Sequence, residues 1–116
     1  MAKYEKDETF VVGQTTTGSI LLNEGALTGF IVTGSVLTGT QITFTASLDG
    51  INFYSLYDAD STEVGLTYAG SPRAYSLNPS VFMAWNSVKA RLGTSASAVA
   101  QATYNQPVAF IVDGMI

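Results

Sequence analysis

The residues that could carry out chemistry in this chain are few. It contains no histidine and no cysteine, which removes the usual general base, the usual thiol nucleophile and most zinc ligands together. A serine nucleophile activated by Lys89 remains formally open, but the Ser-x-x-Lys spacing of known enzymes of that kind is missing. We therefore predict that the protein is not an enzyme and that it uses no cofactor.

One acidic stretch carries Asp58, Asp60 and Glu63 within six residues. Paired carboxylates can cleave a glycosidic bond, but that reaction needs a walled groove, which a small sandwich is not expected to have. Several oxygens on one loop can also bind calcium, although this spacing lacks the glycine and the distal glutamate of an EF-hand. The three residues stay candidate metal ligands, and the alternative is a solvated loop between two strands.

Aromatic side chains offer a second kind of site, because rings stack on the faces of sugars. The alternative is that most of them are core residues or cross-strand partners, and we favour this alternative. The candidates for a sugar-binding face are Tyr54, Tyr57, Tyr68, Tyr75, Trp85 and Tyr104.

A hairpin over residues 41–58 is the element around which the chain is organised. Polar and apolar residues alternate up to Leu48, and Asp49-Gly50 then separates them from a second, aromatic-rich strand, the strongest short-range signal for a tight turn. A two-residue loop predicts that one face carries the pairs Leu48–Ile51, Ala46–Phe53, Phe44–Ser55 and Ile42–Tyr57. Leu56 then lies on the outer face, unless a bulge near Tyr54 turns it inward.

The remaining chain alternates between short apolar runs and turn residues, which predicts about nine or ten strands and an all-β, jelly-roll-like antiparallel sandwich. We expect one domain over residues 10–116, preceded by residues 1–9 as an arm or short edge segment. Residues 80–85 are expected to form a helical turn or a crossing loop that fills the core. Besides the hairpin, the expected strands are 10–12, 18–22, 27–33, 64–68, 73–77, 87–92, 99–104 and 107–112. The last of these is apolar on both faces, so it is central in a sheet or at a subunit contact.

Composition narrows the possible partners. The net charge is −4 and the basic residues are dispersed, which argues against nucleic acid. No run of about 18 apolar residues is present to span a membrane, and the charged first residues lack the apolar core of a signal peptide, which favours synthesis in the cytoplasm. Only 12% of residues are charged, against about 25% in ordinary soluble domains. We infer that neighbouring subunits cover part of the surface; the alternative is a neutral, threonine-rich monomer.

Three stretches, residues 46–58, 71–82 and 88–102, together resemble the small β-sandwich head decoration, or cement, proteins of tailed bacteriophages. The resemblance implies a non-enzymatic virion protein, made in the host cytoplasm, that binds the outer capsid surface and clamps neighbouring major capsid subunits. It also implies self-association, as a homotrimer. The Ser-x-Asp-Gly-x-x-Phe segment of the first stretch, residues 47–53, is by itself also similar to discoidin-like sugar-binding jelly rolls.

The expected capsid or subunit contacts lie near the two ends of the chain, where apolar residues gather. These candidates are Phe10, Val11, Phe110, Ile111, Met115 and Ile116, whereas Asp49 and Gly50 are expected to be structural turn residues. Two other functions stay open: a carbohydrate-binding module of a phage tail or fibre, and a cellular adhesion or structural domain.

Overall fold

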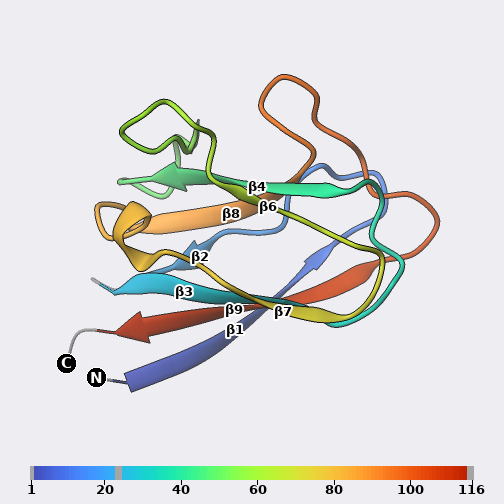
Figure 1. Cartoon of the computed structure of the whole chain (residues 1–116), viewed down its shortest axis with the longest axis horizontal. Coiled ribbons are helices and arrows are strands. Elements are labelled where there is room, and N and C mark those ends of the chain that lie inside the picture. The colour runs from blue at the N-terminus through green and yellow to red at the C-terminus, as the bar shows by residue number, and fades with distance from the viewer. Residues whose placement is uncertain (1, 23–24, 115–116) are drawn as a thin grey trace.

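The computed structural model describes residues 2–22 and 25–114, and within them the chain is an all-β sandwich of two antiparallel sheets (Figure 1). The first sheet has the order β1 (Ala2–Phe10), β9 (Gln106–Gly114), β3 (Ala26–Val32) and β7 (Arg73–Ser76). The second has the order β2 (Ile20–Leu21), β8 (Ser87–Leu92), β4 (Gln41–Ser47) and β5 (Tyr54–Ser55), with β6 (Gly65–Thr67) also paired to β4. A short 3₁₀ helix, η1 (Pro79–Val81), lies between β7 and β8.

The strand pairing is nested, which is the topology of a jelly roll. β1 pairs with β9, β2 with β8, β3 with β7, and β4 with β5 and β6. The chain therefore behaves as one long hairpin that is rolled into two sheets, and β9 and β8 then add to β3 and β4. The predicted jelly-roll sandwich is confirmed. No helix of the described residues is long and apolar enough to cross a membrane.

The first residues of the chain are part of the sandwich. β1 pairs with β9 along its whole length, from Ala2 opposite Gly114 to Phe10 opposite Gln106. The segment expected as an arm or edge segment is therefore a complete edge strand, and its charged side chains suit the solvent side of an unpaired edge. β9 lies between β1 and β3, so of the two alternatives for its apolar faces the structure shows the first, a strand inside a sheet.

Four phenylalanine rings connect the two sheets. Phe30 of β3 packs edge-to-face on Phe44 of β4 across the sandwich, with 5.8 Å between ring centroids. Phe110 of β9 lies 5.1 Å from Phe30, and Phe82, directly after η1, lies 5.4 Å from Phe44. All four are fully buried, and edge-to-face rings add to the stabilisation from apolar burial. Phe82 fills the core as expected for the helical turn.

The hairpin exists, but the predicted register is wrong by one residue. Thr45 pairs with Ser55 and Ala46 with Tyr54, which leaves residues 47–53 as the loop. Ser47 continues the ladder with Ser87 of β8 instead. Because a shift of one residue exchanges the two faces of a strand, Leu56 is buried without any bulge.

A second expectation fails after β8. Residues 99–104 do not form a strand; they belong to the long loop between β8 and β9, in which Gly93 and Ala98 form an isolated bridge. Although this stretch is not a strand, Gln101 within it turns inward and is buried.

We predict that Phe44→Ala lowers the free energy of unfolding by about 3–5 kcal/mol, because it removes the ring that contacts both Phe30 and Phe82. Urea unfolding followed by tryptophan fluorescence measures the loss. Leu21→Ala, at an exposed position of β2, is the control and should change stability by less than about 1 kcal/mol. Equal losses in the two variants would contradict this account of the core.

Candidate functional site

The acidic stretch does not act as a unit. Asp58 folds back on its own loop, and its Oδ1 accepts hydrogen bonds from the backbone N–H groups of Asp60 (2.9 Å) and Thr62 (3.0 Å). Glu63 turns away and forms an ion pair with Arg91. In the part of the chain that the structure describes, no three acidic side chains are grouped to hold a metal ion. The three candidate metal ligands are therefore not brought together.

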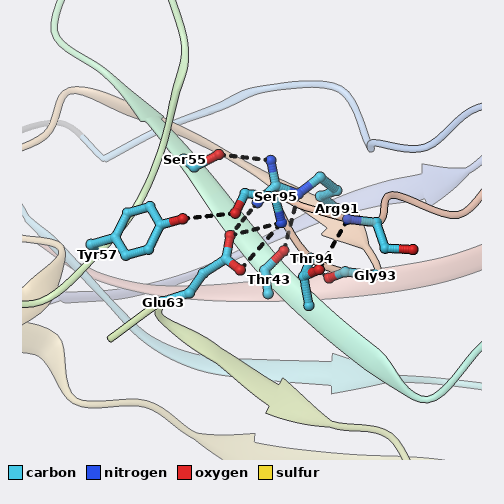
Figure 2. A network of polar contacts seen from close by, with 9 residues as sticks. Thr43, Ser55, Tyr57, Glu63, Arg91, Gly93, Thr94 and Ser95 are labelled. Carbon is cyan, nitrogen blue, oxygen red and sulfur yellow. Dashed lines mark hydrogen bonds and ion pairs between the residues drawn. The ribbon is translucent and has the colours of Figure 1, made fainter. Parts of the chain in front are cut away.

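The ion pair between Glu63 and Arg91 is the centre of a polar network on the outer face of the second sheet (Figure 2). Both side chains are largely buried. Arg91 also donates from Nε to Thr43 Oγ1 (3.1 Å) and from Nη1 to Ser55 Oγ (3.0 Å). Its guanidinium group is thus bonded to β4, to β5 and to the loop after β5.

The same network holds the loop after β8. The backbone N–H of Ser95 donates to Glu63 Oε2 (3.1 Å), and Ser95 Oγ shares a hydrogen bond of 2.7 Å with the hydroxyl of Tyr57. Thr43 completes the network with a bond from its hydroxyl to the carbonyl oxygen of Gly93 (2.9 Å). Because the charged groups are already bonded to one another, the arrangement is a clamp that fixes two loops over the sheet.

Sequence alternation places Lys89 and Arg91 on the outer face of β8, and it gives no signal that this face is covered. The structure buries Arg91 and sets the ammonium group of Lys89 4.3 Å from the centre of the Phe53 ring. Such a cation–π contact covers the apolar ring with the lysine side chain.

The Asp49-Gly50 turn is a rigid loop held by one carboxylate. Asp49 Oδ1 accepts from the backbone N–H groups of Asn52 and Ile51, each at 2.8 Å, and from the hydroxyl of Ser47 at 2.9 Å. Its Oδ2 accepts from Asn52 Nδ2 at 2.8 Å. These bonds, the backbone one from Asn52 first, hold the pKa of Asp49 far below its usual range. Gly50 has a φ of +75°, which a side chain would strain.

This rigid loop presents two large apolar side chains to solvent, Ile51 at 81% and Leu48 at 68% exposure. Leu48 also lines a depression of about 170 Å³ together with Met83 and Trp85, and Met83 is 62% exposed. We call Leu48, Ile51 and Met83 the tip surface. The two-residue turn expected from the sequence would place Leu48 and Ile51 on the inward face. The tip surface was therefore not predicted, because the expected register of the hairpin is wrong by one residue.

The candidate contacts near the chain ends divide into three groups. Phe10 and Phe110 are fully buried in the core, so neither can touch another subunit. Both side chains lie on the face of their strand that points into the sandwich. Val11 is exposed and Ile111 is half-buried. Met115 and Ile116 lie outside the described residues.

The candidate sugar-binding aromatics do not form one face. Tyr68 is buried, its hydroxyl donates to the carbonyl oxygen of Gly34 (3.0 Å), and burial raises its pKa. Tyr54, Tyr57 and Tyr104 are exposed, so they are not core residues, but Tyr54 is a cross-strand partner of Ala46 and Tyr57 forms a bridge with Glu63. Tyr104 lies on the loop between β8 and β9, whereas Tyr54 belongs to β5 and Tyr57 follows that strand.

Comparison with known proteins gives little. No family model matches the chain, and no curated protein matches it. One solved structure with a similar fold, the crystal structure of the SPBc2 prophage-derived protein YomS, has 13% sequence identity and a TM-score of 0.47, and the match covers 97% of this chain and 95% of that one. A likeness of this size carries no argument about function.

We predict that Glu63→Gln lowers the free energy of unfolding by about 3 kcal/mol, because it leaves the buried charge of Arg91 without its partner. Asp60→Asn in the same loop is the control and should cost less than about 0.5 kcal/mol. Chemical denaturation measures both variants. If Glu63→Gln is as stable as the wild type, the network is not a clamp.

A second prediction concerns acid. Because the pKa of Asp49 is lowered in the folded state, its contribution to stability is complete above about pH 4, the unfolded value, and is lost as the pH falls below it. Asp49→Asn keeps the shape and removes the charge. The melting temperature of this variant should be lower than that of the wild type at neutral pH and should fall less steeply below about pH 4. An unchanged slope would contradict this role of Asp49.

Proposed function

We propose that this protein is a head decoration protein of a bacteriophage, which binds the outer surface of the capsid and stabilises it by bridging major capsid subunits. The observation that carries the proposal is the tip surface, where a rigid turn exposes Leu48 and Ile51 beside Met83. Large apolar side chains held in the open are typical of contact surfaces and not of the free surface of a monomer.

The stretches that resemble decoration proteins include or adjoin the residues of the tip surface. The resembling stretch 46–58 contains Leu48 and Ile51, and the stretch 71–82 ends at the residue before Met83. The low charged fraction of 12% supports the same conclusion, because a covered surface needs fewer charges.

The energetics favour a rigid tip. Burying a leucine or isoleucine side chain contributes roughly 1.5–3 kcal/mol, and association normally loses part of this gain to the ordering of loops. The hydrogen bonds of Asp49 order the loop before binding. A protein that binds the assembled shell and not the free subunits stabilises the shell by mass action. We propose the capsid surface as its location, after synthesis in the host cytoplasm.

The test uses capsids that lack the protein, to which purified variants are added back. The wild type should co-sediment with capsids and raise the temperature at which they rupture, whereas Ile51→Ser and Leu48→Ser should bind about tenfold or more weakly. Val36→Ser, at an exposed apolar residue in the loop before β4 and so at the end of that strand away from the turn, is the matched control and should bind like the wild type. Capsid binding that is the same for all four proteins would reject the proposal.

The alternative is a carbohydrate-binding module of a phage tail or fibre. Its supporting observation is that Tyr54 and Tyr57 are both exposed within four residues of chain. A glycan array decides between the two functions: specific glycan binding that Tyr54→Ala and Tyr57→Ala abolish, with no binding to capsids, favours the module.

A further inference from the structure

The turn at Asp49-Gly50 carries a sequence that can react with itself. The backbone nitrogen of the glycine can attack the carboxyl carbon of the aspartate, because glycine has no side chain to hinder the approach and its backbone is flexible. The N–Cγ bond forms, the Cγ–OH bond breaks, and the hydroxyl leaves as water with the proton of the nitrogen. The product is a cyclic imide, the succinimide. Water then opens the ring at either carbonyl and leaves aspartate or isoaspartate.

Ser47 holds the attacking nitrogen. Its Oγ accepts hydrogen bonds from the backbone N–H of Gly50 (2.9 Å) and from that of Asp49 (3.2 Å). Ser47 is fully buried, and its backbone is fixed by the ladder with Ser87 of β8. The nitrogen of Gly50 must lose its proton to react, so this hydrogen bond has to break first, which costs free energy. The serine hydroxyl therefore opposes the attack.

The carboxyl group of Asp49 is held in its unreactive form. Its Oδ1 accepts from the backbone N–H groups of Asn52 and Ile51 (2.8 Å each) and from the hydroxyl of Ser47 (2.9 Å). These bonds favour the carboxylate, and they hold the pKa of Asp49 far below its usual range. Only the protonated carboxyl group has a hydroxyl that can leave as water, so ionisation slows ring closure. The group must also give up these bonds to turn its carbon toward the nitrogen.

The turn is open to water, which the second step of the reaction requires, because Asp49 and Gly50 are both exposed. Hydrogen bonding and not burial is therefore what opposes the reaction. A second pair of the same sequence, Asp113-Gly114, lies at the end of β9 and is held differently, by the ladder with β1. The two pairs have the same chemistry when the chain is unfolded, so one serves as the internal reference for the other.

We propose that Asp49-Gly50 is an isomerisation site that the folded turn keeps closed, and that Ser47 is the residue that keeps it closed. Isoaspartate converts the side-chain carboxyl group into the peptide link to Gly50, which removes the acceptor that orders the loop. It also adds one carbon to the main chain between Leu48 and Ile51, which changes their spacing on the tip surface. The inference goes beyond the proposed capsid contact and does not depend on it, because the reaction is a property of the turn alone.

The test follows isoaspartate at both Asp-Gly pairs during several weeks at neutral pH. Peptide mapping by mass spectrometry, in water enriched in heavy oxygen, detects each ring opening as a label. Each rate is divided by the rate of the same pair in urea-unfolded protein. We expect both pairs to be protected in the folded wild type. Ser47→Ala should raise the rate at Asp49-Gly50 about tenfold or more, the factor that corresponds to one lost hydrogen bond to a charged group, and leave Asp113-Gly114 unchanged.

Ser87→Ala is the matched control and should react like the wild type. Ser87 is also buried and lies opposite Ser47 in the ladder, but the side-chain hydrogen bonds of the turn go to Ser47. Unfolding of a variant raises both normalised rates together, so an excess at Asp49-Gly50 measures opening of the turn even in a destabilised protein.

Three results would overturn the inference. One is a wild-type Asp49-Gly50 that isomerises as fast in the folded protein as in urea. Another is a Ser47→Ala protein in which the normalised rate at Asp49-Gly50 does not exceed that at Asp113-Gly114. The third is an equal excess in Ser87→Ala. Capsid binding is not measured in this test, so its outcome is independent of the outcome for Ile51→Ser.

Discussion

The edge-to-face contact of Phe30 with Phe44 is the interaction on which the rest of the structure depends, because it joins the two sheets at the centre of the core. The strands are nested, and the outermost pair joins β1 to β9, the first and the last strand of the chain. Phe110 of β9 packs on Phe30 and thereby links this pair to the centre. The loops at both ends of the sandwich keep their positions because the strands that carry them are held by these rings.

The loops themselves are ordered by hydrogen bonds from a few side chains, since little apolar surface is available there. Asp49 holds the hairpin turn, Glu63 and Arg91 clamp two loops over the second sheet, and Gln101 joins three loops at the far end. In each case a polar side chain bonds to backbone groups or to a partner of opposite charge, which avoids the cost of leaving a buried group unpaired. A chain with few charged residues can in this way keep long connections in fixed conformations.

An ordered loop can present exposed apolar residues to a binding partner in one fixed arrangement. The tip surface follows the end of β4, on a turn that the hydrogen bonds of Asp49 hold in one conformation. In the proposed function, this turn contacts the capsid. A turn that is ordered before binding loses little conformational freedom on contact.

The sequence by itself determined the class of fold, because alternating apolar residues, Asp49-Gly50 and the two-sided apolar strand at residues 107–112 depend only on local periodicity and turn chemistry. Tertiary structure alone decided the register of the hairpin, where Ser47 pairs with Ser87 and not across the turn. It also decided that Phe10 is core, that Gln101 points inward, and that Arg91 is buried by Glu63, 28 positions earlier. A local pattern cannot show such contacts, because a side chain's exposure depends on what covers it, and the covering residues come from distant parts of the chain.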